Sequence, residues 1–211
     1  MPNIIIFGDS IARWACDYEK QGRVNRLREK VEKADEDSFV YNCGISADTT
    51  AGLIKRFQTE MHARKPRHDE KGTIIIFAIG INDSGFWTIS EMNQVPLEQF
   101  TENIQTLIAQ AKEFTDNITF LGLTAIDDSK TQPYQRSPEK SRNSEQVQRY
   151  DQQLQTICQQ ENIPFLSLQK IIEKSDLDDD GLHPNAQGHQ KIAQQVRKKI
   201  SLEINIAKNI Q

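Results

Sequence analysis

NIIIFGDS, residues 3–10, joins a continuous apolar run to a glycine, an aspartate and a serine. Consecutive β-branched and aromatic residues are typical of a strand that is buried on both faces of a parallel sheet. Gly8 permits a sharp departure from that strand, which leaves the hydroxyl of Ser10 exposed on a turn. The stretch therefore predicts a buried first strand that carries a serine to the edge of a parallel sheet.

Short apolar runs of this kind alternate with amphipathic stretches along the whole chain. The runs are residues 3–7, 39–43, 73–79, 118–124 and 164–168. Four sets of apolar residues repeat at helical spacing, and we interpret all four as core faces of helices: Val24, Leu27 and Val31; Phe100, Ile104, Leu107, Ile108 and Ala111; Val147, Tyr150, Leu154 and Ile157; Ile192, Val196 and Ile200. Alternation of strands and helices predicts an α/β fold around a central parallel sheet.

The length and charge of the chain bear on its number of domains and on the partners it can bind. Its 211 residues suit one domain, and we expect a single domain over residues 1–211 with a core at about 3–200 and a short tail at 201–211. A net charge of -4, with basic residues scattered among acidic ones, argues against a nucleic-acid partner. The oligomeric state stays open.

The cysteines and the first residues bear on localisation. Cys16, Cys43 and Cys158 are widely spaced and lack the spacing of metal ligands, so they are interpreted as reduced thiols. The opening MPNIIIFGDS lacks the features of a signal peptide, and its apolar run is too short to span a bilayer. We therefore expect a cytoplasmic protein without integral membrane association.

Ser10 and His183 are the candidate nucleophile and base. A serine hydroxyl is a weak nucleophile until a base removes its proton; in isolation, Ser10 or Asp9 would be interpreted as a helix cap. His183 precedes Pro184, which holds the histidine in extended backbone just before the last helix. Asp180 lies three residues earlier and can accept the Nδ1–H of the imidazole, which fixes the tautomer that a base requires.

Acyl transfer also needs donors for the tetrahedral oxyanion. Gly44 follows the second predicted strand and offers a backbone N–H, and Asn82 follows the third and offers a side-chain amide. The backbone N–H of Ser10 is the third candidate. In isolation, Gly44 would be a turn glycine and Asn82 part of an Asx turn, but these features occur in order at the ends of successive strands.

These motifs resemble those of the SGNH (GDSL-type) hydrolases over essentially the whole chain. The matching segments are Gly8-Asp9-Ser10-Ile11, Asn42 with Gly44, Gly80-Ile81-Asn82-Asp83 and Asp180-Gly181-Leu182-His183-Pro184. The resemblance implies a flavodoxin-like three-layer α/β/α sandwich with a central parallel five-stranded sheet. It also implies the triad Ser10, Asp180 and His183, the oxyanion donors Ser10, Gly44 and Asn82, and hydrolysis of small-molecule carboxylic esters or thioesters without a cofactor or metal.

For the substrate pocket and the loop near it, the sequence allows two interpretations each. Trp14, Phe86 and Trp87 follow the serine and asparagine motifs, and they either line an acyl pocket or simply pack in loops. The long polar connection at residues 127–144 is either a lid over the site or an ordinary mobile insertion.

Two other functions fit parts of the sequence. Residues 176–181 match the opening of a calcium-binding EF-hand loop, but Gln187 stands where that loop needs a bidentate glutamate. A flavodoxin-like module that binds a nucleotide or another small molecule without catalysis would have the same sheet, but no glycine-rich phosphate loop follows any predicted strand. His62, His68 and His189 are weaker candidates than His183 for the base.

Overall fold

A five-stranded parallel sheet forms the centre of the protein in the computed structural model, which describes residues 2–65 and 72–208. Its strand order is β2-β1-β3-β6-β8, which is the flavodoxin-like order. The strands are β1 (Asn3–Gly8), β2 (Val40–Gly44), β3 (Thr73–Ala78), β6 (Ile118–Leu121) and β8 (Phe165–Leu166). The predicted α/β fold with a central parallel five-stranded sheet is confirmed.

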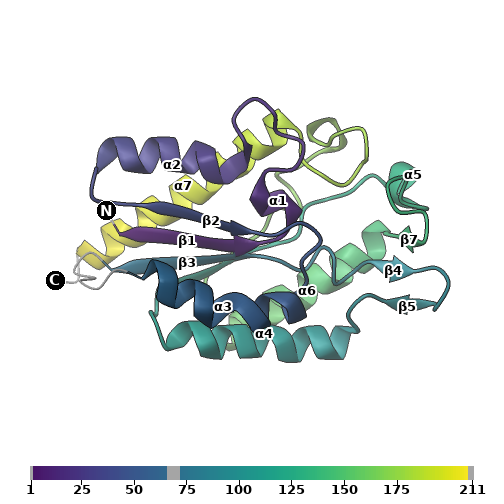
Figure 1. The fold of residues 1–211 in the computed structure, drawn as a ribbon, viewed down its shortest axis with the longest axis horizontal. Coiled ribbons are helices and arrows are strands. Elements are labelled where there is room, and N and C mark those ends of the chain that lie inside the picture. The colour runs from purple at the N-terminus through teal and green to yellow at the C-terminus, as the bar shows by residue number, and fades with distance from the viewer. Residues whose placement is uncertain (1, 66–71, 209–211) are drawn as a thin grey trace.

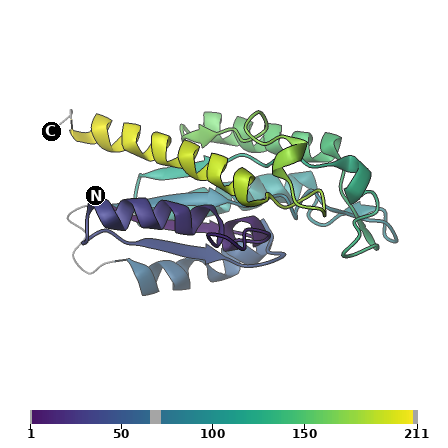
Figure 2. The ribbon, with the colours of Figure 1, turned by 90° about the horizontal axis from the view of Figure 1, so that it is seen from above.

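Helices cover both faces of the sheet, so the protein has three layers. Figure 1 shows α2 above the sheet and α3 and α4 below it, while α7 runs diagonally past the strands. In Figure 2, seen from above, α7 lies beside α2. The helices are α1 (Ser10–Arg13), α2 (Gly22–Ala34), α3 (Thr50–Arg64), α4 (Leu97–Lys112), α5 (Asp128–Thr131), α6 (Ser144–Gln160) and α7 (Ala186–Lys208), with a short 3-10 turn at Lys174–Asp176. Because α7 continues to Lys208, most of the expected tail is helical.

The alternation of side chains along the central strands builds two cores. Ile5 and Phe7 of β1 face the core that α3, α4 and α6 complete, whereas Ile4 and Ile6 face the core shared with α2 and α7. Every residue of the four predicted helical faces is buried in one of these cores. The apolar periodicity therefore identified the packing faces correctly.

The last two strands predicted from the sequence are longer than the strands observed in the structure. The apolar runs at 118–124 and 164–168 form only the four residues of β6 and the two of β8. β8 pairs with β6 through the positions of Phe120 and Leu121 alone. Leu123 and Leu168, beyond the paired residues, are buried by packing. Apolarity therefore marks burial at these positions, while pairing decides where the strands end.

A smaller sheet lies beyond the carboxyl ends of the central strands. It consists of β4 (Phe86–Trp87), β5 (Met92–Asn93) and β7 (Lys140–Ser141), in the order β5-β4-β7. Because β7 belongs to the connection at residues 127–144, that connection is anchored by antiparallel pairing to β4. In the part of the chain that the structure describes, no helix is both long and apolar enough to cross a membrane.

His189 joins the last helix to the segment that follows α1. Its Nδ1 accepts a hydrogen bond from the backbone N–H of Arg23 at 3.2 Å, and its Nε2 donates to the carbonyl of Ala15 at 2.9 Å. Burial, assisted by the positive charge of Arg23, lowers the pKa of His189 to about 4. The imidazole is therefore neutral in the folded protein near pH 7.

This buried imidazole predicts a loss of stability in mild acid. An unfolded histidine binds a proton near pH 6.5, whereas folded His189 does so only near pH 4, so the free energy of unfolding falls as the pH falls through this window. We expect His189 to account for a loss of about 2–3 kcal/mol between about pH 7 and about pH 4.5. Urea unfolding of the wild type and of His189→Gln at the two pH values measures it.

The control is His62→Gln, because His62 is an exposed histidine on α3. Asp83 and Asp151 are buried carboxyl groups with raised pKa values, and they titrate in all three proteins, so comparison of the variants removes their effect. His189→Gln should be less sensitive to acid than both other proteins. An equal pH dependence in all three would contradict a neutral buried His189.

Candidate active site

The turn after β1 places Ser10 at the carboxyl edge of the sheet. The Oδ1 atom of Asp9 accepts a hydrogen bond from the backbone N–H of Ile11 at 2.9 Å and caps α1, which begins at Ser10. A Cβ atom on Gly8 would lie 2.5 Å from the carbonyl oxygen of Ala78 and 2.6 Å from the Cβ of Ala12. Glycine is therefore required at position 8 because β3 and α1 approach the strand so closely.

Ser10, His183 and Asp180 form a continuous hydrogen-bonded chain. The Oγ of Ser10 lies 2.9 Å from Nε2 of His183, although the two residues are 173 positions apart. Nδ1 of the same ring lies 2.6 Å from Oδ2 of Asp180. All three residues predicted as a triad are thus together, in the order that nucleophile, base and orienting carboxylate require.

Asp180 is held as a carboxylate. Burial works to raise its pKa, but the hydrogen bonds from the side chain and backbone of His183 outweigh burial and keep the pKa well below its usual range. Oδ1 accepts the backbone N–H groups of Leu182 and His183, both at 3.0 Å. The turn itself therefore fixes the carboxylate that faces the imidazole.

The segment at residues 127–144 supplies two further partners of Asp180. The hydroxyl of Tyr134 donates to Oδ2 at 3.1 Å, and Nη2 of Arg136 lies 3.3 Å from the same atom. Tyr134 is buried, whereas Arg136 is half exposed. No local sequence pattern indicated either residue, because only the folded chain brings this polar segment against the aspartate.

Asn82 lies in the turn after β3 and is nearly buried. Its Nδ2 donates to the carbonyl of Asp48 at 2.9 Å, and its Oδ1 accepts from Nη2 of Arg142 at 2.9 Å. A guanidinium group can only donate hydrogen bonds, so the amide of Asn82 must turn its oxygen toward Arg142. Arg142 thereby fixes the orientation of the amide, and one of the two Nδ2 hydrogens is directed to Asp48.

Arg142 is an unusual neighbour because its charge is almost completely buried. Its side chain stacks over the ring of Tyr134, with 5.2 Å between the guanidinium carbon and the ring centroid. Its Nε and Nη1 atoms are buried without a hydrogen-bond partner among the described residues. Burial lowers the pKa of Arg142, and the nearby Asp9 and Asp180 oppose that effect.

Gly44 ends β2 and pairs in register with Gly8 of β1. Its N–H donates to Oδ1 of Asn42 at 3.0 Å. A Cβ atom on Gly44 would lie 2.4 Å from the backbone nitrogen of Arg13, so close packing against α1 is by itself a reason for glycine here. The expected oxyanion role of Gly44 stays a prediction.

Asp83 supports the turn that carries Asn82. Its carboxylate accepts the backbone N–H of Thr50 at 3.1 Å and the Thr50 hydroxyl at 2.5 Å, and Asn103 donates to that hydroxyl. Burial raises the pKa of Asp83 to about 7. The second polar residue of the Asn82-Asp83 pair therefore ties the turn to the start of α3.

The three aromatic residues expected at a substrate pocket lie in two places. Phe86 and Trp87 form β4, which follows the Asn82 turn, and Nζ of Lys140 lies 4.4 Å from the ring centroid of Trp87. Trp14 is the C-cap of α1 and lines another hollow, together with Asn42 and Gly44 and with residues of the α2 region. Contact of these three aromatic residues with substrate stays a prediction.

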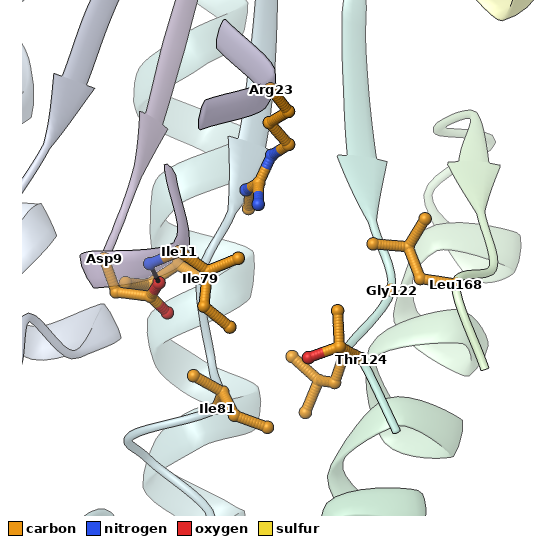
Figure 3. Close-up of a pocket in the computed structure, with 10 residues that line it drawn as sticks. Asp9, Ile11, Arg23, Ile79, Ile81, Gly122, Thr124 and Leu168 are labelled. Atoms are coloured by element: carbon orange, nitrogen blue, oxygen red, sulfur yellow. Dashed lines mark hydrogen bonds between the residues drawn. The ribbon is translucent and has the colours of Figure 1, made fainter. Parts of the chain in front are cut away.

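A small cavity lies behind the serine turn, between β3 and β6 (Figure 3). Its volume is about 20 Å³, which is room for about one water molecule. The buried guanidinium of Arg23 points into it in Figure 3, and Asp9 and Thr124 contribute its other polar groups. The cavity is too small to hold an ester.

The remaining weaker candidates are accounted for by other contacts. His62 is exposed and packs edge-on against Phe114, and His189 is the buried link described above; His68 lies outside the described residues. In the segment at residues 176–181, which matches the opening of an EF-hand loop, Asp176 accepts hydrogen bonds from the backbone of Glu173 and from Lys191. Asp180 instead faces His183. These two carboxylates therefore serve different partners and do not converge on one ion.

A flavodoxin-like sheet with a serine after its first strand and an Asp-x-x-His pair before its last helix defines an SGNH-type hydrolase. Residues 6–191 match the model of the GDSL-like lipase/acylhydrolase family, and the chain belongs to this family. No curated protein sequence matches the chain.

Solved structures agree on the fold. An acetylxylan esterase from Geobacillus stearothermophilus, Axe2, superposes with a TM-score of 0.71 at 19% identity, covering 94% of both chains. A lipase/acylhydrolase from Enterococcus faecalis gives 0.71 at 22% identity over 95% of both chains. An alpha/beta hydrolase enzyme from the metagenome of Lake Arreo, Spain, gives 0.70 at 19% identity over 92% of this chain and 93% of the other.

Proposed function

We propose that this protein hydrolyses carboxylic esters through an acyl-enzyme intermediate on Ser10. The observation that carries the proposal is the hydrogen-bonded chain from Ser10 through His183 to Asp180, with distances of 2.9 and 2.6 Å. Membership of the GDSL-like lipase/acylhydrolase family supports the same class of reaction. Structures of the Axe2 esterase are described as catalytic mutants with a serine, an aspartate or a histidine replaced by alanine.

The proposed reaction has two halves. Nε2 of His183 takes the proton of Ser10 as Oγ attacks the ester carbonyl, and the imidazolium is stabilised by the Asp180 carboxylate. The tetrahedral intermediate collapses, and the departing alcohol takes the proton from His183. Water then attacks the acyl-serine with His183 again as the base, which releases the carboxylic acid. Thioesters undergo the same attack, with a thiol as the leaving group.

The negative charge of the tetrahedral intermediate needs fixed donors. The proposed donors are the backbone N–H of Ser10, the Nδ2 of Asn82 and the backbone N–H of Gly44. For Asn82 the support is the Arg142 contact, which keeps the amide nitrogen away from the guanidinium. Gly44 would have to exchange its hydrogen bond to Asn42 for one to the oxyanion.

Replacement of the nucleophile tests the proposal. Ser10→Ala should abolish hydrolysis because it removes the hydroxyl that His183 activates, while the melting temperature stays close to that of the wild type. The assay is a panel of p-nitrophenyl esters of increasing chain length, acetylated sugars and acyl thioesters. A serine-directed phosphonate should label the wild type at Ser10 and leave Ser10→Ala unlabelled.

Ser46→Ala is the matched control, because Ser46 is an exposed serine in the loop after β2. Its hydroxyl accepts a hydrogen bond from Arg13 and has no place in the proposed reaction. The control should keep both activity and labelling. Full activity in Ser10→Ala, or labelling at another residue, would refute the acyl-enzyme on Ser10.

A double-mutant cycle tests the role of Arg142 as a positioning residue. Asn82→Ala should lower kcat by about 10²–10³, the usual effect of removing one oxyanion donor, with a smaller effect on KM. Arg142→Met should lower kcat by less, because the amide remains but loses its fixed orientation. In the Asn82→Ala background, Arg142→Met should have little further effect, since Arg142 acts through Asn82.

Arg142→Lys provides the conservative comparison in the same cycle, because an ammonium group is also only a donor. It should restore part of the kcat that Arg142→Met loses. Circular dichroism and melting temperatures show whether each variant is folded. Independent, multiplicative effects of the two substitutions on kcat would show that Arg142 does not act through the amide.

A further inference from the structure

Three metal-binding side chains converge beside the serine. The Sγ of Cys16, a carboxylate oxygen of Asp180 and a ring nitrogen of His183 all lie within 4.8 Å of one another. All three residues are buried. Cys16 comes from the segment after α1, whereas the other two residues precede α7, so local spacing did not indicate this cluster.

A positive charge already occupies this region. Nη2 of Arg136 lies 3.3 Å from Oδ2 of Asp180, 3.5 Å from Oδ2 of Asp178 and 3.7 Å from the Sγ of Cys16. Its side chain is 52% exposed, so it can move into solvent without unpacking a core. The donor set therefore already attracts a cation, and that cation is half exposed.

We propose that Cys16, Asp180 and His183 form an inhibitory site for a divalent cation of the zinc type. The ligands would be the Cys16 thiolate, the Asp180 carboxylate and Nδ1 of His183, since Nε2 of that ring faces Ser10. Binding of the cation is independent of the reaction, whereas its inhibitory effect rests on the proposed function of Ser10 and His183.

The chemistry of the ligands explains both selectivity and inhibition. Zinc binds sulfur, nitrogen and oxygen donors in tetrahedral sites and can keep water in the fourth position, whereas magnesium and calcium prefer oxygen alone. The Cys16 thiol would release its proton to solvent when the metal binds. The proton on Nδ1 of His183 would move to Nε2, which then donates to Ser10 and no longer accepts its proton.

Competition with Arg136 follows from the same geometry. The metal would sit among the atoms that now surround the guanidinium, so Arg136 has to leave before the metal binds. Removing the arginine should therefore strengthen metal binding, and removing the thiol should weaken it. Opposite effects from two neighbouring residues are not expected for nonspecific binding of zinc to a surface histidine.

Direct binding is measured with Co²⁺ on the Ser10→Ala protein, so that the result does not depend on hydrolysis. A cobalt–thiolate charge-transfer band in the near ultraviolet is expected, because Cys16 would be a ligand. The band should disappear in Ser10→Ala/Cys16→Ala and persist in Ser10→Ala/Cys158→Ala, where a different buried thiol is removed. Mg²⁺ should not displace Co²⁺, whereas Zn²⁺ should.

Inhibition is measured on proteins that keep Ser10. Cys16→Ala should leave kcat/KM without metal unchanged and raise the Zn²⁺ concentration for half-inhibition by about 10-fold or more, whereas Arg136→Gln should lower that concentration. Cys16→Ser replaces Cys16→Ala if the alanine variant is unstable. Equal inhibition of wild type and Cys16→Ala, or no cobalt–thiolate band, would overturn the metal site. Absence of hydrolysis in the wild type with the band intact would overturn only the proposed function.

Discussion

The contact of α1 with the ends of β1, β2 and β3 is the constraint on which the site depends. Gly8 lies between the carbonyl of Ala78 and the methyl group of Ala12, and Gly44 lies against the backbone of Arg13. Any side chain at either glycine would push α1 away from the sheet. Because Ser10 is the first residue of α1, such a shift would separate its hydroxyl from His183, which the last loop holds independently.

Hydrogen bonds to Asp180 compensate the buried charge that orients His183. A buried carboxylate is costly unless its charge is compensated by hydrogen bonds. Here, two backbone N–H groups, the imidazole and the Tyr134 hydroxyl provide that compensation. The aspartate therefore stays ionised in a water-poor site, where its charge favours the imidazolium that a base must become.

The segment at residues 127–144 joins the two halves of the site. Tyr134 contacts the orienting carboxylate and Arg142 contacts the amide after β3, while the ring and the guanidinium stack on each other. Pairing of β7 with β4 anchors the segment. The alternatives of a lid and a mobile insertion both missed this role, because neither anticipates that a polar connection supplies buried contacts.

The sequence by itself determined the five strands of the central sheet (though not where β6 and β8 end), the core faces and the four motifs, because apolar periodicity and local turn chemistry are properties of neighbouring residues. It identified Ser10, Asn82, Asp180 and His183 as candidates at the edge where parallel strands end. Only the tertiary structure decided that Tyr134, Arg136 and Arg142 reach these residues and that Cys16 lies beside Asp180. Their contacts join distant segments, and such contacts depend on how α1, the smaller sheet and the last loop pack together, which no local pattern encodes.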